Sequence, residues 1–232
     1  MDFVVKTIAI IPARGGSKRI KNKNIKLFCG KPMIAWTIIA AKKAKIFNKI
    51  MVSTDNIKIA NIAKKYGAEV PFLRDKFTDN ISPISKATAY ELNRASIYWK
   101  ENYDIVVQLM ANCPLRNHYD IKKSFYRFVL KKRSFQISCF KFGWMNPWWS
   151  FKLNKKNKGT PLFPKSLKKR SQDLPNLYCP TGAIWIAKTK SFLKSKTFYG
   201  KGYCFEEMDW KNSLDIDDIK DFKFALLAKK IK

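Results

Sequence analysis

Residues 8–24 are Ile8-Ala9-Ile10-Ile11-Pro12-Ala13-Arg14-Gly15-Gly16-Ser17-Lys18-Arg19-Ile20-Lys21-Asn22-Lys23-Asn24. The apolar run that ends at a proline predicts a buried strand over 6–11, and a loop rich in glycine and cations follows it. Glycine lets a backbone turn tightly and approach a ligand closely, and successive exposed N–H groups bind anions. Arg14 and Lys18 would add positive charge against phosphate oxygens. The stretch therefore predicts a phosphate-binding loop after the first strand of an α/β sheet, where ligands lie outside the carboxyl ends of the strands.

The loop by itself leaves a second interpretation open, because two glycines and a serine after a strand also form plain turns. It lacks the Gly-x-x-x-x-Gly-Lys-Ser/Thr spacing of a P-loop and the Gly-x-Gly-x-x-Gly spacing of dinucleotide-binding folds. The rest of the chain has to decide between a turn and a ligand site.

Composition predicts one folded domain with an elaboration. The chain has 232 residues, of which 46% are hydrophobic and 14% aromatic, and this argues against general disorder. No apolar run is long enough to cross a bilayer, and the first residues lack the pattern of a signal peptide. The cysteines are widely spaced and form no Cys-x-x-Cys pair, which predicts reduced thiols in a cytoplasmic protein.

The formal net charge of +30 offers a different class of function, that of a basic nucleic-acid-binding protein. The lysines are spread along the chain, however, and form no block of like charges at either end. A general lysine bias that solvates the surface and attracts anionic substrates is the preferred interpretation.

Strands and helices alternate along most of the chain. Strands are predicted over 6–11, 50–53, 68–72, 104–110, 135–140, 183–186 and 203–207. Helices are predicted from Pro32 to about Lys45, and over 56–66, 85–101 with Ser85 as the N-cap, 118–131 and 218–229. This alternation indicates an α/β fold with a Rossmann-like, mostly parallel sheet flanked by helices.

Residues 141–180 interrupt the alternation with tryptophans, prolines and a lysine-rich turn, and they show no helical period. We interpret them as an inserted arm of strands and loops, which divides a main domain formed by 1–140 and 181–232. So many aromatic residues on an arm predict contact with another surface. The alternative is that the segment folds back on its own core.

Asp215 and Asp217 form the second pattern that predicts chemistry. In an extended segment, residues i and i+2 point to the same side, so both carboxylates could bind one hard cation while Ile216 packs inward. Oxygen ligands suit Mg²⁺, which also recruits substrate phosphates. Taken alone, the motif is better explained by helix capping, with Asp217 and Asp218 as acidic residues in the first turn of the last helix.

Several motifs, in order along the chain, resemble those of the acylneuraminate cytidylyltransferase (CMP-sialic acid synthetase) family. The loop Pro12–Arg19 with Lys23-Asn24 matches the family's nucleotide loop, and Ser213-Leu214-Asp215-Ile216-Asp217 matches its closing Ser-x-Asp-Ile-Asp motif. Further matches are Val52–Asp55, Tyr66–Arg74, Pro114–Arg116, Gln172–Pro175 and Pro180–Trp185.

The resemblance implies a nucleotide-diphospho-sugar transferase type of fold and a reaction of CTP with an acidic nine-carbon 2-keto sugar. It implies Mg²⁺ bound by Asp215 and Asp217, and a homodimer, or a tetramer, built by the inserted arm. The catalytic residues would be Arg14, Lys18, Lys23 and Asp217. Substrate and nucleotide would be bound by Ala13, Gly15, Gly16, Ser17, Asn24, Arg74, Gln108 and Arg116, with Arg170 and Gln172 acting across the subunit interface.

The chain departs from the family pattern in the loop Met110-Ala111-Asn112-Cys113, where Gln-Pro-Thr-Ser is usual. Gln108 lies on the same strand face two residues earlier and could replace the missing glutamine. Cys179 and Thr181 replace a common arginine and a usual asparagine. These departures leave pseudaminic, legionaminic and eight-carbon sugar acids open as alternative substrates. His118, the single histidine, is interpreted as an ordinary surface residue.

Overall fold

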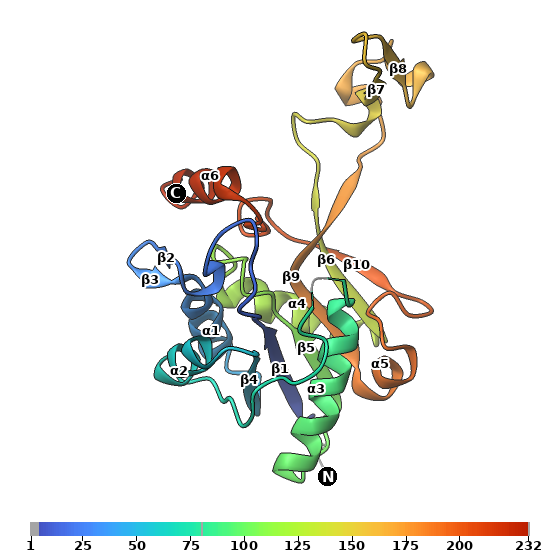
Figure 1. Ribbon diagram of the computed structural model, residues 1–232. Helices are drawn as coiled ribbons and strands as arrows, with labels where there is room; N and C mark the ends of the chain where they lie inside the picture. Colours follow the sequence, from blue (N-terminus) through green and yellow to red (C-terminus); the bar gives the residue numbers. More distant parts are fainter. Residues whose placement is uncertain (1–4, 80, 232) are drawn as a thin grey trace.

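A six-stranded sheet in the order β10-β6-β9-β5-β1-β4 forms the centre of the computed structural model, which describes residues 5–79 and 81–231 (Figure 1). β9 runs antiparallel to both of its neighbours, β5 and β6, and the other pairs are parallel. The predicted α/β fold with a mostly parallel sheet is confirmed. The strands are β1 (Thr7–Pro12), β4 (Lys49–Ser53), β5 (Ile105–Gln108), β6 (Phe135–Lys141), β9 (Tyr178–Lys188) and β10 (Cys204–Glu207).

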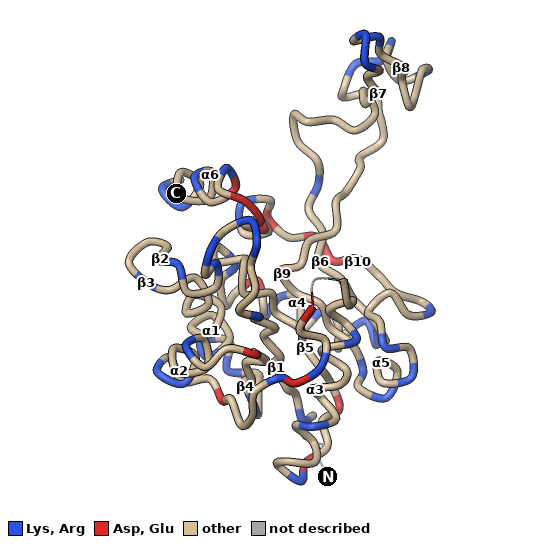
Figure 2. Tube along the Cα trace, in the orientation of Figure 1, with Lys and Arg blue, Asp and Glu red and all other residues tan. Residues whose placement is uncertain are grey.

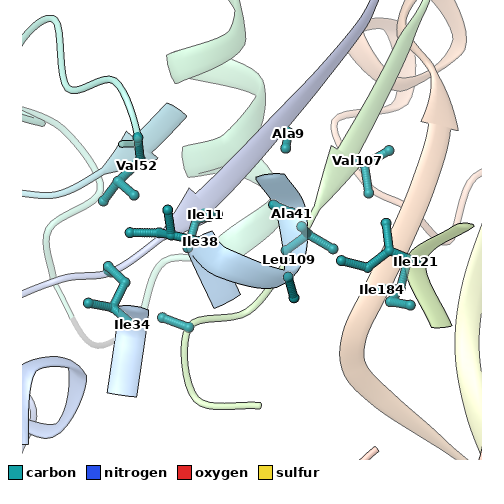
Figure 3. Close-up of a cluster of buried hydrophobic side chains, with 14 of the residues drawn as sticks. Ala9, Ile11, Ile34, Ile38, Ala41, Val52, Val107, Leu109, Ile121 and Ile184 are labelled. Carbon is teal, nitrogen blue, oxygen red and sulfur yellow. The ribbon is translucent and has the colours of Figure 1, made fainter. Parts of the chain in front are cut away.

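Helices cover both faces of the sheet because successive strand residues point to opposite sides. Ala9 and Ile11 of β1 pack with residues of α1, α2 and α4 (Figure 3), whereas Ile8 and Ile10 pack with residues of α3 and α5. These side chains are fully buried, which explains the uninterrupted apolar run of β1. The helices are α1 (Met33–Ala44), α2 (Ile57–Lys65), α3 (Ile84–Trp99), α4 (His118–Leu130), α5 (Thr189–Ser195) and α6 (Ile219–Ala228).

Helix ends follow local sequence signals. The Asn56 side chain accepts hydrogen bonds from the backbone N–H groups of Lys58 and Ile59 and so caps α2. Gly67 has a φ of 88° just beyond the end of that helix, a conformation that glycine adopts without strain. The predicted helix start at Asn56 and stop at Gly67 are therefore confirmed to within a residue.

A third apolar cluster fixes the C-terminal segment above the first loop. Phe222 of α6 packs edge-on against Phe28, with ring centroids 5.7 Å apart, beside the fully buried Met33. Phe28 belongs to the short hairpin of β2 (Leu27–Phe28) and β3 (Lys31–Pro32). Ile216, just before α6, is also fully buried in this cluster. Its inward packing was predicted, and it brings the acidic segment next to the glycine-rich loop.

The segment between β6 and β9 extends away from the sheet (Figure 1). It consists of loops, single 3₁₀ turns and the small hairpin of β7 (Phe151–Leu153) and β8 (Gly159–Pro161). This confirms strands and loops without a helical period. Trp144 is 88% exposed, and Met145, Phe151, Leu153 and Leu162 are exposed as well.

Two local expectations are wrong, and one helix was not expected. Residues 68–72 form no strand and contribute one isolated bridge, Met51 to Glu69, because the chain turns into an irregular segment there. Ser85 is a buried residue inside α3, whose N-cap is Pro83. The helix α5 was not predicted; its few residues follow β9 directly, and Phe192 supplies its buried contact.

Across the residues that the structure describes, no helix combines the length and apolar character needed to cross a bilayer.

Candidate active site

A cavity of about 220 Å³ lies beyond the carboxyl ends of β1 and β5. These two strands are parallel neighbours, so the segments that follow them meet at one edge of the sheet. The first loop supplies Arg14, Ser17, Lys18, Arg19, Lys23 and Asn24 to its lining. The other sides are formed by Arg74, Ile84, Met110, Ala111, Asn112 and Asp217, together with Pro12 and Ile20. Figure 2 shows the basic loop beside the acidic segment that precedes α6.

The glycine-rich loop is held against the start of α2. The Gly15 backbone N–H donates to the Asp55 carboxylate at 2.7 Å. A Cβ at Gly15 would lie 2.8 Å from Nδ2 and 2.9 Å from Cβ of Asn56, so a side chain at this position would displace the cap of α2. Gly16 has open space around it, which leaves room for a ligand to approach its backbone. The Asn24 amide donates to the Arg14 carbonyl at 3.0 Å and ties the two ends of the loop together.

Lys23 and Asp217 connect the loop to the acidic segment. Lys23 Nζ donates to Asp217 Oδ1 at 3.1 Å and to the Ile216 carbonyl at 2.9 Å, and Arg19 lies 3.0 Å from Asp217 Oδ2. Partial burial acts to raise the pKa of Asp217, but the hydrogen bond and charge of Lys23, together with Arg19, outweigh it and lower the pKa. Asp217 is therefore ionised at neutral pH.

The loop after β5 holds both aspartates. The Asn112 amide donates to Asp217 Oδ1 and to the Ile216 carbonyl, each at 3.3 Å. The Cys113 thiol donates to Asp215 Oδ1 at 2.5 Å, and the Gly182 N–H donates to Asp215 Oδ2 at 3.2 Å. Partial desolvation and the charge of Asp217 raise the pKa of Asp215, although the residue is exposed on one side.

The donor set at this point fits a cation that prefers oxygen. Asn112 Oδ1 is buried and has no hydrogen-bond partner among the described residues, and it lies on the side chain that contacts Asp217. No cluster of three His, Cys, Asp or Glu side chains that could enclose a metal occurs within 5–79 and 81–231. The Asp217 carboxylate and the Asn112 amide oxygen, completed by waters and substrate phosphates, are nevertheless ligands of the kind that Mg²⁺ uses.

Arg74 contributes a buried cation to the lining of the cavity. The residue is 4% exposed, and neither Nε nor Nη1 has a hydrogen-bond partner among the described residues. Desolvation lowers the pKa of Arg74, and the nearby carboxylates Asp55 and Glu91 act against that shift. Because buried N–H groups are seldom left without partners, the side chain is suited to bind an anionic ligand.

The structure places other predicted site residues outside the cavity lining. Gln108 is fully buried and accepts from the Thr88 hydroxyl at 2.6 Å. Arg116 is 2% exposed and donates to the carbonyls of Ala183 at 2.6 Å and Met110 at 3.3 Å. Arg170 and Gln172 lie in the arm, where Arg170 pairs with Asp173.

The remaining predicted positions flank the cavity or lie apart from it. Ala13 is buried directly before Arg14, and Asp215 does not line the cavity. His118 is half-buried at the start of α4, stacked on Tyr119, and does not line the cavity.

Sequence reasoning missed Asp55, Arg19 and Asn112 as parts of this site. Asp55 follows β4 and Asn112 follows β5, so their places after adjacent parallel strands were the available signal. Arg19 belongs to the glycine-rich loop itself, and its contact with Asp217 spans most of the chain.

The chain is similar to known cytidylyltransferases. Residues 8–142 match the family model described as cytidylyltransferase. The chain is 35% identical over 230 residues to the pseudaminic acid cytidylyltransferase of Campylobacter jejuni, covering 98% of this chain and 97% of the relative. It is 34% identical to the CMP-N,N'-diacetyllegionaminic acid synthase of the same species, with 96% and 94% covered. The N-acylneuraminate cytidylyltransferase of Escherichia coli is 30% identical, and the match covers 98% of this chain and 53% of that protein.

Solved structures show the same fold at low sequence identity. A CMP:2-keto-3-deoxy-manno-octonic acid synthetase complexed with CTP superposes with a TM-score of 0.70 at 16% identity, covering 97% of this chain and 100% of that one. The 4-diphosphocytidyl-2C-methyl-D-erythritol synthase of Anaerococcus prevotii gives a TM-score of 0.66 at 14% identity, covering 98% and 99%. Taken with the family match and the full-length relatives, the chain belongs to the cytidylyltransferase family, in its acylneuraminate cytidylyltransferase-like group, and is a nucleotidyltransferase.

Proposed function

We propose that this protein transfers the CMP group of CTP to a nonulosonic acid and releases pyrophosphate. The observation that carries the proposal is the joint lining of one cavity by the cationic loop, by Arg74 and by the ionised Asp217. Both proposed substrates are anions, and a cavity lined by cations suits both of them. Because CTP is the proposed donor, we propose that the reaction takes place in the cytoplasm.

In the proposed reaction, the anomeric hydroxyl oxygen of the sugar acid attacks the α-phosphorus of CTP. The bond from that phosphorus to the bridging oxygen breaks, pyrophosphate leaves with the bonding electrons, and the proton of the attacking hydroxyl passes to solvent water. Arg14, Lys18 and Lys23 would stabilise the charge that develops on the leaving group, with Ser17 and the loop N–H groups as further donors. Asn24, by holding the loop closed, would keep these groups in place, and Arg74 would bind the acidic sugar.

Mg²⁺ is the proposed cofactor, with Asp217 and Asp215 as its protein ligands. Asp217 lines the cavity, and the neighbouring oxygen of Asn112 has no other partner among the described residues. Bound there, Mg²⁺ would neutralise phosphate charge and lower the pKa of the attacking hydroxyl. Until the metal binds, Lys23 and Arg19 hold the Asp217 carboxylate in position.

A substrate panel tests this function. We would measure pyrophosphate release from CTP and Mg²⁺ with sialic, legionaminic, pseudaminic and eight-carbon 2-keto sugar acids, and repeat each reaction with UTP. We expect turnover that requires CTP and one of the nine-carbon acids. The pseudaminic and legionaminic acids are the first candidates, because relatives named for them match almost the full length of both chains. Binding of CTP without turnover of any acid would contradict the proposal.

The arm is proposed to join two subunits. The arm extends away from the sheet of its own subunit (Figure 1), and its apolar side chains are exposed. In the proposed dimer, Arg170 and Gln172 on the arm would reach the partner's cavity. We expect light scattering to give at least twice the mass of one chain. Replacing residues 144–176 by a short glycine-serine link should give a folded monomer with little activity, and a wild-type protein of single-chain mass would contradict the proposal.

A further inference from the structure

Arg74 reaches the cavity from a segment that has no regular secondary structure. Residues 71–75 lie outside the helices and strands, and the Arg74 backbone N–H donates to the Thr54 carbonyl at 2.8 Å. A cation that must meet an anionic ligand at a defined place needs more support than one backbone hydrogen bond. That support comes from α3.

Arg94 of α3 contacts the residues on both sides of Arg74. Its guanidinium carbon lies 3.8 Å from the centroid of the Phe72 ring. Nη1 donates to the Leu73 carbonyl at 3.2 Å and to Asp75 Oδ1 at 3.1 Å. One side chain thus contacts a ring, a carbonyl and a carboxylate within four consecutive residues, through the face of its guanidinium group and through Nη1.

Arg94 also forms an ion pair with Glu91, the acidic residue of α3. Arg94 Nη1 lies 3.1 Å from Oε1 of Glu91, which is fully buried. Glu91 Oε2 has no partner among the described residues, and its charge acts on Arg74. If Arg94 were removed, Glu91 would need a new partner, and Arg74 is the cation close enough to influence it. A direct pair between them would engage the N–H groups of Arg74 that have no partner among the described residues.

We infer that Arg94 is a positioning residue that holds the 72–75 segment and keeps Glu91 from capturing Arg74, so that Arg74 faces the anionic ligand. The inference rests on the proposed function only for the identity of that ligand, the sugar acid. The contacts of Arg94 with Glu91 and with residues 72–75, which we call the Arg94 clamp, do not depend on the proposed function.

Hydrogen exchange and kinetics of Arg94 variants test the clamp. In Arg94→Ala we expect faster amide exchange in residues 70–77, with β1 and β5 unchanged. We also expect a rise of about tenfold in KM for the sugar acid and a change of less than about twofold in KM for CTP. Arg94→Lys retains a positive charge for Glu91 but loses the stacking of the guanidinium group on Phe72, so its effects should be intermediate. If Arg94→Ala folds poorly, Arg94→Lys is the variant in which exchange and KM are measured. Lys86→Ala, which removes an exposed cation from the same helix, is the matched control for net charge.

A double-mutant cycle separates positioning from a general loss of stability. In an Arg74→Ala background, Arg94→Ala should raise KM for the sugar acid no further, because the cation that it positions is gone. An additive effect, or faster exchange throughout the sheet, would overturn the inference. If no acid in the panel is turned over, the proposed function fails, but local exchange at 70–77 still tests the clamp. Unchanged exchange there would overturn the clamp in its turn.

Discussion

Replacing Asp217 by Asn is expected to lower kcat by about a thousandfold, equivalent to about 4 kcal/mol of transition-state stabilisation. The carboxylate is held by Lys23, Arg19 and Asn112 at the edge of the cavity and is ionised at neutral pH. Asn keeps the size of the side chain but removes the charge that a bound divalent cation needs. The measurement is the rate of pyrophosphate release at saturating CTP and Mg²⁺, together with Mn²⁺ affinity by isothermal titration calorimetry.

Asp218→Asn is the matched control because the neighbouring carboxylate has a different role. Asp218 caps α6 by accepting from the backbone N–H groups of Lys220 and Asp221. Asn caps helices about as well as Asp, so activity should stay within about twofold. Equal losses in both variants would mean that the segment, and not the Asp217 charge, is what the reaction needs.

Replacing Arg116 by Ala is expected to reduce the free energy of unfolding by about 2–5 kcal/mol. The buried guanidinium ties the loop after β5 to β9 through the Met110 and Ala183 carbonyls. Its removal would take a donor from both carbonyls, of which Met110 keeps the Thr37 hydroxyl, and would open space in the core. Urea denaturation followed by tryptophan fluorescence gives the change in unfolding free energy.

The same variant decides whether Arg116 also binds substrate, as the family resemblance implies. Arg127→Ala is the control, because the Arg127 side chain is 50% exposed and pairs with Glu206, which keeps Arg133 as a second partner. We expect Arg127→Ala to change the unfolding free energy by about 1 kcal/mol or less. Wild-type stability of Arg116→Ala combined with a large rise in KM would show a substrate contact in place of a structural one.

Much of the fold follows from local sequence signals. The buried strands are short apolar runs, and Asn56 and Gly67 limit α2 through a side-chain cap and a positive φ. Residues 68–72 were mistaken for a strand because the apolar character of Val70 and Phe72 does not reveal whether a partner strand lies beside them. In the structure, Phe72 packs under Arg94, and this requires α3.

The sequence by itself determined the α/β class, and it predicted a phosphate-binding loop over residues 12–24 and a metal site at the acidic pair before α6. These signals are local, because strand, glycine-rich loop and alternating aspartates are adjacent in the chain. Only the tertiary structure decided which polar side chains face the cavity. Gln108 turns to Thr88, Arg116 is buried against β9, and Asn112 reaches Asp217, which lies more than a hundred residues later in the chain. Such pairings depend on which strands and helices become neighbours, and no local pattern of residue types encodes that.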